Sequence, residues 1–478
     1  MDDNLIERRD WVPLNKRNHL SIIHICGIAA GTLVSNLLWC ILFTLFTPLS
    51  ELVKLESWIR ILVLFYGSLS GFIISPLLGV ISDTLMFRWG RRRIFMLIGG
   101  IILVGGLLIM MYTMQIGRMI LPNKKDGENG AQKGVLIASM VLCFTAGNIV
   151  QAPARTLCSD VTPPKQQVLM SNICQIYGGI GGVFSNLVGG LKLYEYTQLT
   201  QEQFILVVCL SISAVAMTVS IIVTPETPLN EKPPKINPFK QIWNALKRMP
   251  RAYQRVIIPF TLSYLCVYQF QFQFSHFMGN DIFGGSNQPD ASDYKNQLYQ
   301  DGVSWSMMCN VMNCGFQCIY GFVNTKFCEW IGMKAVMIIG LSFLTLAFFS
   351  FFFVNNKYAY LGITIPIGIG SLIINAIPYA VVSLVIPTEE LGANLGLLNC
   401  FGVFGQQLSN FGIGSGLGAI WPDNPRMMIG LSSIPGLIGV IFAFFIITPG
   451  IGDMSEYNQI PDRSTQEVSA SLISTDDF

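Results

Sequence analysis

The chain has 478 residues, of which 51% are hydrophobic and 12% are charged, with a formal net charge of +2. Soluble domains are about 25% charged, so this composition excludes a disordered chain, a nucleic-acid-binding protein and almost any ordinary soluble enzyme. The mean hydropathy of +0.51 indicates a chain that is solvated by lipid, where each span needs about 20 apolar residues. We therefore expect an all-α membrane protein.

Twelve apolar blocks follow one another along the chain, six on each side of a long polar gap. Each block is long enough for one helical span. We expect an N-terminal tail (1–19), a six-helix bundle (20–223), a linker (224–255), a second six-helix bundle (256–447) and a disordered C-terminal tail (448–478). The predicted spans are 20–45, 58–80, 94–113, 135–157, 168–190, 204–223, 256–274, 303–322, 336–354, 360–386, 395–415 and 427–447.

The connection between the second and third spans is short, polar and strongly charged. It reads GVISDTLMFRWGRRRIFM over 79–96. An acid and a cluster of cations in so tight a turn can form an ion-pair latch that favours one of two arrangements of the bundles. The alternative is that the arginines only anchor the topology. The predicted gate residues are Asp83, Arg88, Gly90, Arg91 and Arg92.

This connection recurs between the eighth and ninth spans, as GFVNTKFCEWIGMKAVMI over 321–338. At one constant offset, Gly90 matches Gly332 and Arg92 matches Lys334. The offset is about half the chain. We therefore expect two bundles that are related by duplication.

Lysine and arginine counts predict the orientation. With twelve spans both termini lie on one side, and the segments on that side hold 19 of the 30 Lys and Arg residues, against 10 on the opposite side. We therefore expect a multi-pass protein with cytoplasmic termini, although the outer segment 118–133 holds four cations against this rule. The plasma membrane and a vacuolar or vesicular membrane both stay open, and a monomer is the default state.

The linker between the bundles contains an amphipathic pattern. Phe239, Ile242, Trp243 and Leu246 are interleaved with lysines and arginines, after a stretch that is rich in proline. This spacing suits a short helix on the inner membrane surface. Its basic residues would lie near anionic lipid headgroups.

Amide side chains are frequent inside the predicted spans. They are costly there unless they face a wet cavity or one another, and a polyol substrate explains them better than an ion or a lipid. Some will only join helices. The predicted substrate-binding residues are Asn148, Gln151, Arg155, Asn172, Gln175, Asn399 and Gln406. Further candidates inside spans are Asn36, Tyr177, Gln269, Gln271, Gln273, Asn310, Asn313, Gln317, Asn375, Tyr379 and Gln407.

Three ionisable residues in or beside the spans are candidates for further roles. Arg155 and Asp160 lie about one helical turn apart near the inner end of the fourth span, where an ion pair and a substrate contact are both open readings. Histidine is the side chain whose ordinary charge change lies near neutral pH, and His276 lies at the predicted outer mouth of the seventh span. His276 and Asp160 are the predicted proton-coupling candidates.

The sequence predicts no metal site and no cofactor. Cys309, Cys314 and Cys318 lie at helical spacing, but no carboxylate or histidine accompanies them, so we interpret them as small packing residues. HExxH, GxSxG and P-loop patterns do not occur in the chain. An enzyme is therefore not expected.

Several of these segments resemble a known family. In the 79–96 connection, Gly-x-x-x-Asp followed by Arg-x-Gly-Arg-Arg is similar to the loop signature of the major facilitator superfamily, and RWGRRR resembles its sucrose/H+ symporter branch, of the glycoside-pentoside-hexuronide type. Three further blocks resemble that branch in the right order: GNIVQAPARTLCSD (147–160), FSHFMGNDIFGG (274–285) and GLLNCFGVFGQQ (396–407). The resemblance implies the major facilitator fold, with twelve transmembrane helices in two six-helix bundles. It also implies transport of sucrose or another small glycoside by alternating access around a midplane site.

Acids that the branch carries are replaced in this chain. Phe144 stands in the fourth span, and Phe274 and His276 stand at the end of the seventh. Proton-coupled symport and a proton-independent facilitator therefore both stay open. A carrier of another small polar solute, such as a nucleoside or an amino acid, and a membrane sensor that has lost turnover are the remaining alternatives.

Overall fold

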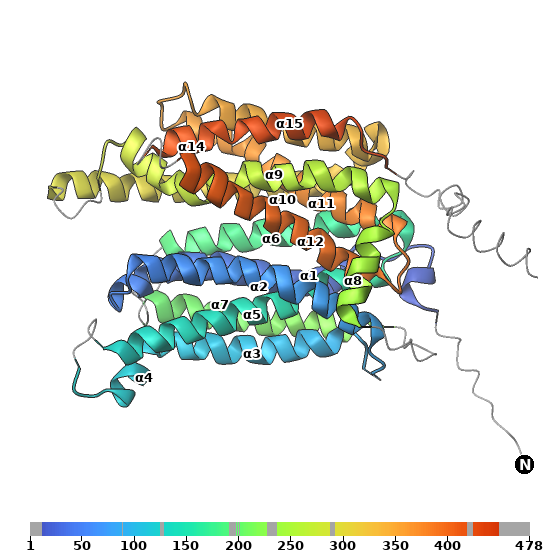
Figure 1. Cartoon of the computed structure of the whole chain (residues 1–478), viewed down its shortest axis with the longest axis horizontal. Coiled ribbons are helices and arrows are strands. Elements are labelled where there is room, and N and C mark those ends of the chain that lie inside the picture. Colours follow the sequence, from blue (N-terminus) through green and yellow to red (C-terminus); the bar gives the residue numbers. More distant parts are fainter. Residues whose placement is uncertain are drawn as a thin grey trace, which may run out of the picture.

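The computed structural model describes residues 12–87, 89–124, 129–190, 197, 199, 201–226, 237–286, 292–417 and 424–448, and the regular elements within them are all helical. In Figure 1 the helices of the first half lie below those of the second half, with α6 between them. The first half contains α1 (Ile22–Leu52), α2 (Ser57–Thr84), α3 (Arg93–Met111), α4 (Thr113–Ile120), α5 (Gly130–Val161), α6 (Gln167–Gly190) and α7 (Gln201–Val223). The second half contains α9 (Arg251–Phe277), α10 (Asp293–Ser350), α11 (Ala359–Val385), α12 (Leu391–Leu408), α14 (Pro425–Leu431) and α15 (Ser433–Ala443).

Each predicted apolar block lies on a helix, but the boundaries differ in three places. The eighth and ninth spans are two helices within α10 (Asp293–Ser350), which meet directly at a kink with non-helical backbone at Gly332. The eleventh continues from α12 into the π-helical segment η5 (Ser409–Leu417), and the twelfth is divided between α14 and α15. The short helix α4 lies in a connection for which the sequence indicated no helix.

The two halves meet along helices that are less apolar than the rest. Among the described residues, eight helices are long and apolar enough to cross a bilayer by length and composition, and α6, α9 and α12 are not in that set. Across the boundary between the halves, α12 packs along α2, and α6 packs along α10 and α11, whereas α9 packs on helices of its own half. Helices that face a partner bundle tolerate polar residues that lipid would not, which explains the lower hydropathy of α6 and α12.

Buried apolar side chains form two separate clusters, one in each half. The first draws on helices α1 to α7, and the second on helices α9 to α15 together with Val168 of α6. The second cluster is rich in aromatic rings, including Phe270, Phe274, Phe277 and Phe351. Each half therefore has its own core, and the interface between them is free to be polar.

The linker helix α8 (Pro238–Lys247) lies across one end of both bundles, at the right in Figure 1. It packs against α2 of the first half and α12 of the second. Phe239 and Trp243 are exposed on it, beside basic residues, which is the arrangement of a helix on a membrane surface. We call this end of the molecule the charged end, because it also contains Asp83 and Arg92.

The two repeated connections share an unusual backbone conformation. Gly90 has a φ of 111° and Gly332 a φ of 84°. Residues with a Cβ rarely adopt a positive φ of this size. The repeat in the sequence therefore corresponds to a glycine with positive φ at the matching position of each half.

Replacing Gly332 by alanine tests this backbone requirement. A Cβ at Gly332 would meet no atom within 4 Å, so the cost comes from the φ of 84° and ψ of 150° alone. We expect Gly332→Ala to cost about 1–3 kcal/mol and to lower the apparent melting temperature of the purified protein.

Gly315 is the matched control, because it lies inside the same element and a Cβ there also meets nothing within 4 Å. Its backbone is helical, so Gly315→Ala should keep or raise the melting temperature. Equal effects of the two substitutions would contradict the assignment of strain to Gly332.

Candidate functional site

Arg92 lies at the centre of the charged end. Its side chain has 0% exposure and bridges two carboxylates. One is Asp83, in the last turn of α2, and the other is Asp160, near the end of α5, whose Oδ2 is 2.9 Å from Arg92 Nε. Since Arg92 itself stands immediately before α3, this ion-pair cluster joins the ends of three helices of the first half.

The same cluster reaches across to the second half. The carboxylate of Asp83 accepts hydrogen bonds from the backbone N–H groups of Gly392 (3.2 Å) and Ala393 (2.9 Å), in the first turn of α12. Arg91 donates to Asp160 at 3.2 Å and to the carbonyl of Thr388 at 3.3 Å. A carboxylate at a helix N-terminus is stabilised by the unpaired N–H groups and the helix dipole.

We call Asp83, Arg91, Arg92 and Asp160 the charged latch. Gly392 allows its close approach, since a Cβ there would lie 2.6 Å from both Arg92 Nη1 and Asp83 Oδ1. The structure thus brings together Asp83, Arg91 and Arg92 of the predicted gate. Arg88 lies outside the described residues.

Glu226, which the sequence did not mark as a functional residue, supports the latch by binding the backbone next to Arg92. Its carboxylate accepts hydrogen bonds from the backbone N–H groups of Arg92 and Arg93, the latter at 2.9 Å. A Cβ at Gly90 would lie 2.4 Å from Glu226 Oε1, so Gly90 is required by space as well as by its φ. Burial raises the pKa of Glu226 above its ordinary value, against the opposing effect of these two N–H groups. The only signal in the sequence was an acid between two prolines, directly after a span.

A second, uncharged contact joins the bundles at the equivalent place in the repeat. Asn324 and Thr325 of α10 occupy the positions that Ser82 and Asp83 occupy in the first half. Asn324 donates to Asn172 Oδ1 at 2.7 Å, and Asn172 donates to Thr325 Oγ1 at 2.9 Å. The predicted substrate residue Asn172 is therefore fully buried in a contact between α6 and α10.

Three other predicted substrate residues also form hydrogen bonds between helices. Asn148 donates to Ser70 at 2.9 Å, and Asn399 donates to Ser75 at 3.2 Å, so that both are bound to α2. Gln151 accepts from the indole N–H of Trp39 in α1 at 2.6 Å.

The last two amides predicted to bind substrate are Gln175 on α6 and Gln406 on α12. Gln175 is buried on α6, and its backbone carbonyl accepts from the side chain of Gln317 of α10 at 3.1 Å. Gln406 is half-buried on α12. Next to it, both polar atoms of the Gln407 side chain are buried without a partner among the described residues.

Arg155 belongs to a different group of polar side chains, deeper between the bundles. Its guanidinium lies over the ring of Tyr379 in α11, 4.3 Å from the centroid. Tyr264 of α9 interacts electrostatically with Arg155 and donates to Asn375 Oδ1 of α11 at 2.6 Å. We call Arg155, Tyr264, Asn375 and Tyr379 the central cluster, which is built from α5 of the first half and α9 and α11 of the second.

The reading of Arg155 and Asp160 as an ion pair is wrong. Asp160 is bound by Arg91 and Arg92 instead. Five residues along a helix turn a side chain by about 140° from the first, so Arg155 and Asp160 point to different neighbours.

His276 lies at the end opposite to the charged latch, in the last turn of α9. Its Nδ1 is 3.2 Å from the hydroxyl of Tyr299. Nearby, Asp281 pairs with Arg426 at 3.6 Å. Burial raises the pKa of Asp281 above its ordinary value, and Arg426 opposes that shift. The two proton-coupling candidates, His276 and Asp160, thus lie at opposite ends of the molecule.

Two positions at which the resembling branch carries acids lie in apolar surroundings here. Phe144 is stacked on Trp39 with ring centroids 5.6 Å apart. Phe274 is buried in the aromatic core, 4.6 Å from the ring of Phe270. A carboxylate at either position would be buried without a counter-ion, which is strongly unfavourable.

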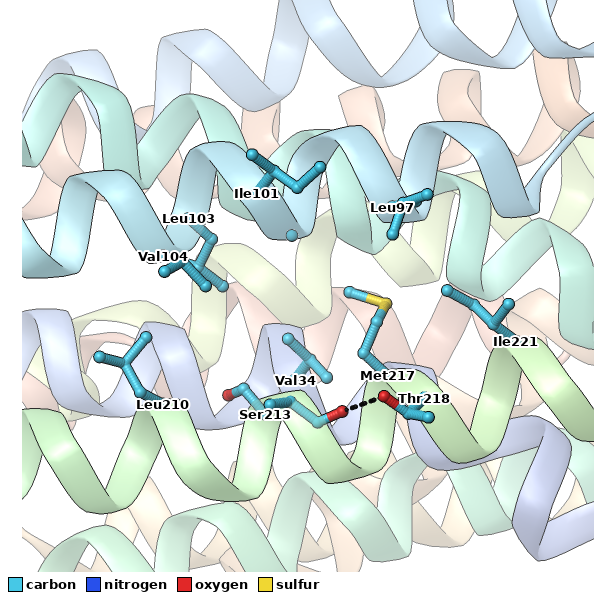
Figure 2. Close-up of a pocket in the computed structure, with 12 residues that line it drawn as sticks. Val34, Leu97, Ile101, Leu103, Val104, Leu210, Ser213, Met217, Thr218 and Ile221 are labelled. Atoms are coloured by element: carbon cyan, nitrogen blue, oxygen red, sulfur yellow. Dashed lines mark hydrogen bonds between the residues drawn. The ribbon is translucent and has the colours of Figure 1, made fainter.

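Figure 2 shows a cavity of about 300 Å³ between α3 and α7. Leu97, Ile101 and Val104 line it from α3, and Leu210 and Met217 from α7. Its lining is almost entirely apolar, and it contains none of the central cluster. It is therefore unsuited to a polar solute and does not define the functional site.

Comparison with known proteins shows what the chain is similar to. A family model described as Major Facilitator Superfamily matches residues 28–410. The chain is 24% identical to sucrose transport protein SUT5 of Oryza sativa subsp. indica, over 67% of this chain and 63% of that protein. It is 23% identical to sucrose transport protein SUC4 of Arabidopsis thaliana, over 91% of each. The chain thus spans less than two thirds of the rice relative.

Two solved structures share the fold. A bacterial homologue of the iron transporter ferroportin, in its outward-facing state, superposes with a TM-score of 0.65 at 11% identity, over 88% of this chain and 98% of that chain. The human organic anion transporter MFSD10 (TETRAN) superposes with a TM-score of 0.63 at 14% identity, over the same shares. At these identities the likeness extends to the fold alone.

The charged latch predicts that breaking a buried ion pair lowers the stability of the protein much more than breaking an exposed one. Asp83→Asn leaves Arg92 buried with one of its two carboxylates lost, which we expect to cost about 3–5 kcal/mol. Glu56, by contrast, pairs with Lys133 on the surface, where screening leaves little net gain. Thermal unfolding of both purified variants should show a marked drop for Asp83→Asn and no measurable change for Glu56→Gln. Two similar curves would contradict a stabilising latch.

Proposed function

The chain belongs to the major facilitator superfamily, and on this basis we propose that it is a transmembrane transporter that moves a small sugar or glycoside by alternating access between its two bundles. The observation that carries the proposal is the central cluster. It places a cation, two phenols and an amide between the bundles, and both bundles contribute to it. A binding site between two bundles that rock against each other can be exposed to either side in turn.

The sugar is supported by the chemistry of the site and by the relatives. Hydroxyl groups need neutral donors and acceptors, and the central cluster offers them in Tyr264 and Asn375. Aromatic rings such as Tyr379 can pack on the apolar face of a sugar. Two proteins similar to this chain over two thirds or more of its length are sucrose transport proteins.

We further propose that the charged end is cytoplasmic. The segments on that side hold 19 of the 30 lysine and arginine residues, as the positive-inside rule requires. The latch would then close the cytoplasmic side, and opening toward the cytoplasm would separate Asp83 from the start of α12. One chain contains both bundles and all parts of the central cluster, so a monomer would suffice for transport.

A second candidate is a proton-independent facilitator, and one observation favours it. The helices α2, α5, α6, α9, α11 and α12 contain two acids, Asp83 and Asp160, and both are bound in the charged latch. The central cluster therefore has no carboxylate that could exchange a proton with substrate. His276 is the remaining candidate for coupling, and it lies at the far end of α9.

A sensor without turnover and an enzyme fit the molecule less well. A latch that ties two bundles through side chains and a helix terminus is useful to a protein whose bundles separate during its cycle. The proteins to which the chain is similar are transporters by their names.

Transport is tested with the purified protein in liposomes and a panel of labelled sugars: sucrose, glucose, maltose and glucuronate. We expect saturable uptake of at least one member. Arg155→Ala should reduce that uptake by roughly tenfold or more, because a charged hydrogen-bond donor is lost. Lys133→Ala, which removes a surface cation, is the matched control and should transport normally. Absence of uptake across the whole panel would contradict the proposal.

An inward proton gradient separates the two transport candidates. A facilitator equilibrates the sugar and does not respond to a protonophore. Accumulation above equilibrium that collapses with a protonophore and is lost in His276→Ala would instead establish symport through His276.

A further inference from the structure

The cavity between α3 and α7 is an apolar crevice at the outside of the first bundle. Figure 2 shows α3 on one side of it and α7 on the other, and the buried Val34 of α1 lines it from within the bundle. Three of its α3 side chains, Leu97, Ile101 and Val104, are themselves exposed, Ile101 to 65%. Both helices are long and apolar enough to cross a bilayer. The crevice therefore borders the hydrocarbon of the membrane.

The crevice exists because a side chain is missing from its α3 wall. Gly100 contributes none, and a Cβ there would lie 3.3 Å from Met217 Cε. The hydroxyl groups of the lining are bound within α7, where Thr218 donates to a backbone carbonyl at 2.7 Å and Ser213 lies 3.9 Å from a thiol. Water does not fill an apolar space of this kind. Its natural occupant is a hydrocarbon chain.

A cation stands at the end of the crevice. Arg93 is the first residue of the span in α3, and its position, four residues before Leu97, places it on the same face of that helix. It lies one turn, about 6 Å, nearer to the charged end. Its Nε donates to the carbonyl of Trp89 at 2.7 Å, and its Nη1 donates to the carbonyl of Thr224, directly after α7, at 2.9 Å. Within the described part of the chain, Arg93 Nη2 has no hydrogen-bond partner and Arg93 forms no ion pair.

A guanidinium at the head of an apolar crevice matches the chemistry of a phospholipid. Arginine N–H groups bind phosphate oxygens well, and cations at the start of a span lie at the level of the lipid headgroups. The lining of α3 runs from Leu97 to Val104, which is about 10 Å along the helix axis and suits part of an extended acyl chain. A sterol has an apolar body but no phosphate to meet Arg93.

We propose that this crevice binds a phospholipid of the surrounding membrane, with one acyl chain between α3 and α7 and the phosphate on Arg93. The inference does not depend on the solute that the protein carries. Glu226 binds the backbone N–H groups of both Arg92 and Arg93, so the headgroup would lie beside the segment that supports the charged latch. The lipid would join the ends of α3 and α7 at that place.

A photoactivatable lipid locates the acyl chain. Proteoliposomes are prepared with phosphatidylcholine that has a diazirine in one acyl chain, and the labelled peptides are identified after irradiation. We expect labelling concentrated on 97–104 and 210–221. Gly100→Leu fills the crevice and should reduce this labelling roughly tenfold or more, because the burial of several methylene groups is lost.

Gly105→Leu is the matched control. Gly105 lies on the same helix outside the lining, and a Cβ there meets nothing within 4 Å. This variant should be labelled like the unmodified protein. Equal labelling of the two leucine variants, or labelling spread evenly over the spans, overturns the inference.

A pair of lipids tests the phosphate. Dioleoylphosphatidylglycerol and dioleoylglycerol have the same acyl chains, but only the first has a phosphate. Native mass spectrometry of the delipidated full-length protein should show roughly tenfold or more tighter binding of the phospholipid, since a charged hydrogen bond exceeds a neutral one. Arg93→Gln should lose this preference, and Lys326→Gln, which removes an exposed cation of the repeated connection, should keep it.

Thermal unfolding separates lipid binding from a purely structural role of Arg93. Dioleoylphosphatidylglycerol should raise the apparent melting temperature of the delipidated protein, because a ligand of the folded state stabilises it, and Arg93→Gln should abolish most of that rise. A structural arginine would lower the melting temperature without lipid and leave the rise intact, and that result contradicts the proposal.

Two other occupants give results of their own. If cholesterol displaces the photoactivatable lipid more effectively than unlabelled phosphatidylcholine does, the crevice is a sterol site and the inference fails. If Gly100→Leu binds dioleoylphosphatidylglycerol as tightly as the unmodified protein does, the headgroup binds without a chain in the crevice, and the inference also fails.

Discussion

The burial of one guanidinium determines how the two halves of this protein are held together. Arg92 is inaccessible to solvent, and a charge in that position is tolerable only with close counter-ions. Asp83 and Asp160 supply them, and arginine can satisfy both because its donors point in several directions. Asp83 in turn binds the first N–H groups of α12. One buried cation thus fixes three helix ends of the first half and orients the carboxylate that holds the second half.

The two duplicated halves differ in this arrangement of charges. Gly90 and Gly332 both have a positive φ, yet the position of Asp83 is occupied by Thr325 in the second half. There the bundles are joined by neutral hydrogen bonds through Asn172 and Asn324. Water can replace a neutral hydrogen bond at modest cost, whereas separating the latch exposes a carboxylate, two arginines and a helix terminus together. The charged connection therefore costs more to separate than the neutral one.

The sequence predicts the elements of this molecule better than their partners. Apolar blocks locate the helices because a bilayer imposes length and composition on each of them. The same reasoning located the two spans that meet at Gly332, but it did not show that a kink joins them directly, since a glycine kink and a short loop look alike in a sequence. Charge clustering identified Asp83 and Arg92 correctly. For Asp160 it left an ion pair with Arg155 and a substrate contact open, and the structure instead pairs Asp160 with Arg91 and Arg92 of the connection between α2 and α3. The amides were correctly placed inside spans. Only the packing shows that four of them bind other helices: Asn148, Gln151, Asn172 and Asn399. Nothing in the chain marked Glu226 as a support for the latch.

Asp83 holds the bundles together at the charged end through its hydrogen bonds to Gly392 and Ala393. Trp89 and Trp330 stand on the two repeated connections and are 67% and 75% exposed, so spin labels at cysteines introduced there report the separation of the halves. We expect one short, narrow distance distribution in the otherwise unmodified protein and a longer, broader one after Asp83→Asn. An unchanged distribution in a variant that remains folded would contradict it.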